Sequence, residues 1–435
     1  MTDQNTQERF IESVQAALRN YDTQLQAINH EIWSHPELAY EEHRAHDAIC
    51  TLFETLSTTT DFTFTIERSA YGLPTAFEVL YTLGDPQQGR TVAFNAEYDA
   101  LPGIGHACGH NLIATSSIAA FLATCHAMRA TAAAGGGEPT ANFTVKLLGT
   151  PAEESGGGKI QLLSRGAYEN VHASLMVHPV PLAPGKPELL TLATVLPGGY
   201  LANDKLRVRF TGKAAHAAAA PWEGVNALDA VVAAYVNVSL LRQQILPTQR
   251  VHGVIVHGGE RPNVIPRSAS VDYYIRSPTV KSLKGLSERV VRCFEAAAVA
   301  TGCEVEFEWG PSYADLKTNN PICESYVAVM RAMGHLALFD NTGLKGSITG
   351  ASTDQGNVSY AVPGFHGIFT IPTDGVNHTP GFTKGAGSLE AYQQGMACAA
   401  GMAVVACRVL VDEEFAARVQ KDFATERESL TADST

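Results

Sequence analysis

The strongest constraint on the fold is an alternation of strand-like and helix-like segments along the first 180 residues. Strands are predicted where short apolar runs are bounded by turn residues, and helices where apolar residues recur every three or four positions. Alternation of this kind predicts an α/β fold, with a mostly parallel sheet and helices on both of its faces. The predicted helices cover residues 7–34, 41–57, 111–130 and 159–168, and the strands cover residues 74–83, 91–96, 143–148 and 173–177.

A second pattern interrupts this alternation after a proline-rich stretch at residues 181–187. Its order, βαββαβ, is that of a ferredoxin-like α+β unit. We therefore expect a catalytic α/β domain formed by residues 1–190 and 313–435, interrupted by an inserted domain at residues 191–312. The inserted elements are strand 205–210, helix 227–245, strands 251–256 and 269–275, helix 283–301 and strand 304–309; the first pattern resumes with helix 321–333, strand 367–371 and a helix at 388–411.

Composition excludes several classes of protein. A chain of 435 residues with a net charge of −13 lacks the basic surplus that nucleic-acid binding requires. The N-terminus has no apolar signal core, and the most apolar stretch, residues 397–411, is interrupted by Arg408 and is shorter than the roughly 20 residues of a membrane span. Eight irregularly spaced cysteines do not form a disulfide framework. We expect a cytoplasmic protein with no nucleic-acid or membrane partner.

Polar side chains follow the predicted strands, at the point where each strand ends. Asp99 and the run from Gly105 to Asn111 follow strand 91–96. Glu153 and Glu154 follow strand 143–148, and His178 and His378 follow the strands that end at residues 177 and 371. Ligands of an open parallel sheet bind outside the carboxyl ends of its strands, so these residues are predicted to meet there.

The residue types at this edge are those of a metal site. Thiolate, imidazole and carboxylate groups are the ligands that zinc prefers. Taken singly, each signal is weak: a cysteine two residues from a histidine usually packs in a core, and adjacent glutamates usually face solvent. Their joint placement at the ends of four strands favours a shared metal site over four separate structural roles.

Several strings of residues, in order along the chain, resemble metallopeptidase family 20. The likeness is strongest to its amidohydrolase and dipeptidase branch, which contains auxin-conjugate amidohydrolases and the mammalian beta-alanyl-lysine-type dipeptidases, and it runs from about residue 25 to residue 410. The strings are Ala96-Glu-Tyr-Asp-Ala-Leu-Pro102, His106-Ala-Cys-Gly-His110, Gly149-Thr-Pro-Ala-Glu-Glu154, Gly212-Lys-Ala-Ala-His216, Pro262-Asn-Val-Ile-Pro266 and Asn377-His-Thr379.

The resemblance implies a catalytic domain that binds two divalent metal ions, zinc first and manganese as the alternative. Cys108 would bridge the ions. Glu154 and His378 would complete one site, and His110 and His178 the other. Glu153 would be the general base, which takes a proton from the attacking water and passes it to the leaving amine. Asp99 would orient a metal ligand.

The resemblance also assigns a role to the inserted domain, which would act as a lid and a dimerisation domain. His216 would reach the active site of the partner subunit in a homodimer and donate to the oxyanion. Asn263 and Arg276 match positions that bind the terminal carboxylate of the substrate. The expected substrate is a dipeptide or an N-acyl amino acid with a free carboxylate, cleaved at its amide bond.

Three alternatives remain. A cysteine hydrolase with Cys108 as nucleophile would leave Glu154, His178 and His378 without a role. A metal-retaining binding protein without turnover would have no use for Glu153. The same site could also form amide bonds in a biosynthetic pathway. Two departures from most of the branch, Glu97 and Asn111, stand where aspartate is common and concern substrate identity.

Overall fold

The computed structural model describes residues 2–134, 142–182, 185–186, 193–195, 199–339 and 350–432. These residues form two compact units. The second unit runs from Gly198 to Leu316 and includes a return segment that ends at Gly356, and the first contains the rest of the chain. Most of the proline-rich stretch at residues 181–187, and the junction predicted at residues 190–191, lie outside the described residues.

The first unit is built on an eight-stranded sheet in the order β1-β2-β4-β3-β5-β12-β6-β11. Its central strands β4, β3, β5 and β12 are parallel, while β1 and β2 join antiparallel at one edge. This is the parallel-rich α/β sheet that the alternation predicted. The strands are β1 (Thr65–Arg68), β2 (Phe77–Leu83), β3 (Arg90–Ala96), β4 (Phe143–Gly149), β5 (Val171–Pro181), β6 (Ala193–Val195), β11 (Ala337–Phe339) and β12 (Gly364–Ile371).

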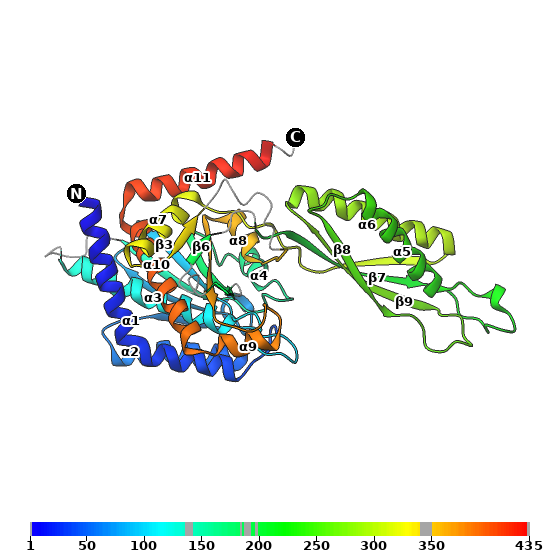
Figure 1. Ribbon diagram of the computed structural model, residues 1–435, viewed down its shortest axis with the longest axis horizontal. Coiled ribbons are helices and arrows are strands. Elements are labelled where there is room, and N and C mark those ends of the chain that lie inside the picture. Colours follow the sequence, from blue (N-terminus) through cyan, green and yellow to red (C-terminus); the bar gives the residue numbers. More distant parts are fainter. Residues whose placement is uncertain are drawn as a thin grey trace. The chain divides into compact units, whose positions relative to one another are not determined.

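Helices cover this sheet (Figure 1). Two of them, α3 and α10, pack against the central strands, and α1 packs on both helices. The sequence did not predict α11, nor the full length of β5, and it predicted α4 four residues too long. The helices are α1 (Thr2–Ser34), α2 (His43–Thr59), α3 (His110–Ala134), α4 (Gly158–Ser164), α7 (Asn320–Ala332), α8 (Gln355–Ala361), α9 (Pro380–Ala386), α10 (Leu389–Val411) and α11 (Glu413–Ala432).

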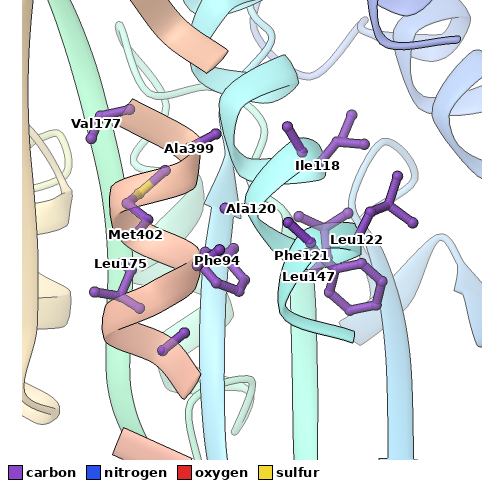
Figure 2. Packing of buried hydrophobic residues seen from close by; sticks show 14 of the residues in the cluster. Phe94, Ile118, Ala120, Phe121, Leu122, Leu147, Leu175, Val177, Ala399 and Met402 are labelled. Carbon is purple, nitrogen blue, oxygen red and sulfur yellow. The ribbon is translucent and has the colours of Figure 1, made fainter. Parts of the chain in front are cut away.

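The core of the first unit lies between the sheet and these helices. Figure 2 shows Phe94, Leu147 and Leu175 of the strands facing side chains of α3 and α10 such as Phe121 and Met402. By length and composition alone, α3 and α10 could cross a membrane, but 94% and 72% of their apolar windows are buried inside the molecule. Their hydrophobicity is therefore explained by their place in the core.

The second unit is a four-stranded antiparallel sheet in the order β10-β7-β9-β8 with two helices. Alternating burial along β7 and β9 places their apolar side chains under α5 and α6. The order βαββαβ is the predicted ferredoxin-like arrangement. Its elements are β7 (Ala202–Thr211), α5 (Ala227–Leu241), β8 (Arg250–His257), β9 (Ser268–Ser277), α6 (Val280–Thr301) and β10 (Glu304–Trp309).

Candidate metal centre

The ends of the parallel strands bring the predicted polar residues of the first unit together. Asp99 follows β3, and Glu153 and Glu154 follow β4, the neighbouring parallel strand. His178 does not follow its strand as predicted: it lies inside β5, which continues to Pro181 and pairs His178 with Ile368 of β12. The carboxyl edge of the sheet is therefore a site formed from segments that are far apart in the sequence.

The thiol of Cys108 belongs to two groups of potential metal ligands. Cys108, His110 and His178 offer three ligand atoms that all lie within 4.8 Å of one another, and so do Cys108, Glu154 and His378. The Cys108 Sγ atom is 3.3 Å from His178 Nε2, and His378 Nε2 is 3.3 Å from Glu154 Oε1. Two ions that share the sulfur could therefore be held side by side by these residues.

Asp99 fixes both the metal-facing histidine and the glutamate segment. Its Oδ1 atom lies 3.0 Å from His110 Nδ1 and accepts the backbone N–H of Glu153, and its Oδ2 atom accepts the backbone N–H of Glu154. Burial alone would raise the pKa of Asp99, but the adjacent His110 outweighs it and lowers that pKa. Asp99 thus remains ionised, and it turns Nε2 of His110 toward the other ligands, as partners of metal-binding histidines commonly do.

Two glycines make the local backbone possible. Gly109, between Cys108 and His110, has φ +80°, and a Cβ atom there would lie 2.5 Å from Pro179 Cγ. Gly158, at the start of α4, approaches Pro151 so closely that a Cβ atom would lie 1.8 Å from the Pro151 carbonyl oxygen. Only glycine allows these turns, which direct the ligand side chains into one site.

The electrostatics of the site fit a cation. Burial, reinforced by the charge of Glu154, raises the pKa of the Cys108 thiol well above its usual range. A divalent ion would reverse this effect, because a coordinating thiol loses its proton. His110 Nε2 is buried and has no hydrogen-bond partner among the residues that the structure describes. The donor set, thiol plus imidazole plus carboxylate, is that of zinc.

His178 is prepared as a neutral ligand. Burial lowers its pKa to about 4, so the ring carries no charge at neutral pH. Its Nδ1 atom lies 2.8 Å from the carbonyl oxygen of Pro179, and this hydrogen bond leaves Nε2 to face Cys108. A fixed tautomer of this kind is typical of metal-binding histidines.

Glu153 lies in the same site but outside both groups that contain the thiol. Its side chain is 7% exposed, and its Oε2 atom is 3.8 Å from His110 Nε2. Its potential ligand group contains instead Glu97 and His110. Of the two adjacent glutamates, Glu154 thus faces Cys108 and His378, whereas Glu153 is a carboxylate beside them.

The three residues predicted for the inserted domain all lie in the second unit. His216 is exposed, and its Nδ1 atom accepts the backbone N–H groups of Ala218 and Ala219. The segment after His216 pairs with the segment that contains Asn263, through a hydrogen bond from the Ala217 N–H to the Asn263 carbonyl. Arg276, on β9, donates from Nη1 to the carbonyl of Gly350 and to Ser352 Oγ.

Other polar residues near the motif have structural roles. His106 donates from its ring Nε2 to the Ile32 carbonyl oxygen, 2.9 Å away, and burial lowers its pKa to about 4. The Asn111 amide donates to Asn29 Oδ1 and to the carbonyl of Ala386. These two side chains hold helices of the first unit together.

Sequence reasoning did not assign a role to three charged residues beside the site. Glu97 and Lys159 form a buried ion pair, with 2.6 Å between Oε1 and Nζ. Glu42, which is also buried, accepts the backbone N–H of Ala152 just before the two glutamates. A signal was present in the sequence: Glu97 directly follows an apolar strand, and Lys159 directly follows three glycines.

An α/β unit whose strand ends carry two ligand groups with a common thiol, together with an inserted ferredoxin-like unit, defines a class of metal-dependent hydrolase. Residues 203–302 match the family model described as a peptidase dimerisation domain. The chain is 42% identical to the Xaa-Arg dipeptidase of Mus musculus, over 92% of this chain and 88% of that protein. It is 31% identical to a p-aminobenzoyl-glutamate hydrolase of Escherichia coli, over 75% of this chain and 65% of that protein.

A solved structure supports the fold. A dinuclear metal-binding peptidase of the M20 family from Bacillus subtilis matches 90% of this chain and 99% of its own, with a TM-score of 0.66 and 20% identity. The chain belongs to metallopeptidase family 20 (M20) and is a metal-dependent hydrolase of peptide or amide bonds.

Proposed function

We propose that this hydrolase cleaves small substrates with a free terminal carboxylate, either dipeptides or N-acyl amino acids, and that dipeptides ending in arginine are the first to test. The observation that carries the proposal is the position of Cys108 in two ligand groups with Glu153 beside them. The names of the relatives, Xaa-Arg dipeptidase and p-aminobenzoyl-glutamate hydrolase, support an amide next to a free carboxylate.

Two divalent ions would bind at this site, with zinc favoured and manganese as the alternative. Cys108 would contribute to both ions, with His110 and His178 on one side and Glu154 and His378 on the other. A pair of ions at such a site supplies an activated water and polarises the amide carbonyl. Asp99 would keep His110 and both glutamate N–H groups in place during the reaction.

Glu153 would act as the general base. Its carboxylate is within reach of the water that lies between the two ligand groups, and none of the thiol-containing groups uses it. It would take a proton from the water and return it to the departing amine, which must leave protonated to be a good leaving group. Solvent exchange with Glu153 is limited, because its side chain is 7% exposed.

The second unit would bind the far end of the substrate and supply an oxyanion donor. Since His216 Nδ1 accepts two backbone N–H groups, the ring proton must lie on Nε2, which is then a donor at neutral pH. The contacts of Arg276 with Gly350 and Ser352 hold the guanidinium plane, whose other edge would meet the terminal carboxylate. Asn263, on the segment that faces His216, would add a polar contact to the same substrate.

We also infer a homodimer formed through the second unit. Strand β8 is the edge of its sheet, and it exposes Val254, Ile255 and Val256 at 62%, 46% and 53%. Helix α5 exposes Val236 at 49% and Leu240 at 68%. An apolar edge of this kind favours association with a second copy. A cytoplasmic location is consistent with the eight cysteines, all of which are free.

The proposal is tested by turnover of a substrate panel with zinc- or manganese-loaded protein. The panel contains Xaa-Arg dipeptides, dipeptides ending in glutamate, N-acetyl amino acids and p-aminobenzoyl-glutamate, and release of the amino acid is measured in both reaction directions. We expect hydrolysis of at least one class, with Xaa-Arg fastest. Cys108→Ala should lose at least one ion and activity, whereas Cys125→Ala, a buried cysteine on α3, should keep both. Net amide formation under physiological substrate levels, or full activity of Cys108→Ala, would contradict the proposal.

A further inference from the structure

A buried ion pair beside the candidate metal centre has no role in the function described so far. Lys159 and Glu97 are 0% and 1% exposed, and their side chains are 2.6 Å apart. Burying two charges costs several kcal/mol per ion before their attraction is counted. Lys159 is also the second residue of α4, where the helix dipole disfavours a positive charge. Stability alone is therefore a poor reason for this pair.

The position of Glu97 suggests another reason. Glu97 directly follows the last residue of β3, and its Oε2 atom is 3.6 Å from His110 Nε2. Both atoms are buried, and neither has a hydrogen-bond partner among the described residues. A carboxylate oxygen and an imidazole nitrogen that face each other at this distance, without a shared proton, have the separation of two ligands on one ion.

The two oxygens of Glu97 are not equivalent. Lys159 binds Oε1, so only Oε2 is directed toward the ligand atoms of the site. Ligand atoms of Glu97, His110 and Glu153 lie within 4.8 Å of one another, next to the group formed by Cys108, His110 and His178. Lys159 also cancels the charge of Glu97, so that this carboxylate adds a ligand without adding net negative charge to the site.

We propose that Glu97 is the fourth protein ligand of the ion held by Cys108, His110 and His178, and that Lys159 restricts it to one oxygen. This inference rests on the proposed function, since it requires that the two ions bind. It makes the two metal sites unequal. One ion has four protein ligands, and the other, held by Cys108, Glu154 and His378, has three. An ion with three protein ligands keeps an open position for substrate, so the amide carbonyl would bind on the Glu154 side.

The first experiment measures the affinity of each ion by competition with a chromophoric zinc chelator, without any activity assay. Glu97→Gln should weaken one of the two ions by at least about tenfold and leave the other unchanged, since even residues that only support a ligand change metal affinity by about 10–100-fold. Glu97→Asp keeps the charge but shortens the side chain, and should also weaken that ion. It serves as the second variant if the glutamine protein does not fold.

The chain offers a matched control. Lys146 and Glu78 form a second buried ion pair on neighbouring strands of the same sheet, 2.8 Å apart and outside every ligand group found among the described residues. Glu78→Gln and Lys146→Met should lower thermal stability, as any broken buried pair does, and leave both zinc affinities unchanged. A loss of metal in these variants as large as in Glu97→Gln would show that instability, not coordination, is the cause.

The second experiment uses cobalt, whose visible absorption reports its ligands and geometry. In the cobalt-loaded protein, Glu97→Gln should change the absorption bands of one ion. Lys159→Met should shift these bands while both ions remain bound, because the freed Oε1 atom can then coordinate too. Unchanged zinc affinities and an unchanged cobalt spectrum in Glu97→Gln would overturn the proposal. That result would leave the proposed function intact, because the function depends on Cys108→Ala and the substrate panel.

Discussion

The adjacent glutamates 153 and 154 illustrate how neighbouring residues of one type are separated into different roles. The carboxylate of Asp99 binds both of their backbone N–H groups, which sets the direction of the two side chains. Glu154 then meets His378 at 3.3 Å, and Glu153 lies beside His110 at 3.8 Å. The backbone alone thus distinguishes a metal ligand from a carboxylate that is available for proton transfer.

Glu153→Gln should therefore retain both ions and lose turnover by a factor of about 10²–10⁴, the usual contribution of general acid–base catalysis. Glu154→Gln should lose an ion. Metal content by elemental analysis and turnover on the best substrate of the panel distinguish the two variants. If Glu153→Gln loses metal and Glu154→Gln does not, the two roles are exchanged.

Glu42 should make the stability of the metal-free protein depend on pH. Burial raises its pKa to about 7, from 4.5 in a solvated chain, so the folded state binds this proton more tightly than the unfolded state. The stabilisation is complete below the unfolded pKa and is lost as the pH rises through about 7. A tenfold difference in proton affinity between the two states corresponds to about 1.4 kcal/mol, so up to about 3 kcal/mol is at stake.

Glu42→Gln keeps an acceptor for the Ala152 N–H group but cannot ionise. We expect its melting temperature at pH 8 to exceed that of the parent protein, and the difference to shrink toward pH 5. The measurement is thermal melting of chelator-treated protein at a series of pH values. Melting curves that differ by the same amount at every pH would mean that Glu42 titrates normally.

The turn before α4 offers a test on the scale of a structural element. In Gly158→Ala the new methyl group would collide with the Pro151 carbonyl oxygen, 1.8 Å away, and the turn that carries both glutamates must shift. We expect loss of metal binding and activity with the sheet intact by circular dichroism. Gly285→Ala is the control: nothing lies within 4 Å of its added methyl group on α6, so it should stabilise that helix by about 0.5–1 kcal/mol.

The elements themselves were largely predictable, because their apolar periodicity reflects burial. The inserted βαββαβ unit followed from alternation along its strands, and the core helices from long apolar runs. The end of β5 was not predictable, because Pro179 and Pro181 are typical of strand termini. Beyond Leu175, β5 is paired with β12 but no longer with β3, so prolines that lack an N–H group can continue the strand.

The site was predictable where residue types were unusual and less so where they paired at a distance. Cys108 and His178 stood out as metal ligand types at strand ends, and the structure brings them to 3.3 Å. Lys159 gave no such signal, because a lone lysine is ordinarily solvated and its partner is 62 residues away in the sequence. Finding that pair requires the packing of β3 against the segment after β4, which no local pattern encodes.

On the scale of the whole molecule, the exposed apolar edge of the second unit should determine the oligomeric state. Leu240→Glu and Ile255→Glu place charges on α5 and β8, where the side chains are 68% and 46% exposed. If a second copy covers this edge, the variants should be monomeric by light scattering and should lose most of their activity. Val299→Glu is the control, since Val299 on α6 is 84% exposed and lies outside this edge. Variants that remain dimeric would place the interface elsewhere.

A homodimer with shared sites makes a stricter prediction about His216. His216→Ala should lose turnover by about 10²–10³, the effect of removing one oxyanion donor, with metal content unchanged. If His216 acts in the partner's site, a mixed dimer of His216→Ala and Glu153→Gln contains one site with both residues intact. Random exchange in an equal mixture gives half mixed dimers, so about a quarter of the parent activity should return. Exchange is verified with differently tagged subunits. A mixture that exchanges and stays inactive would mean that His216 acts within its own chain or takes no part in the reaction.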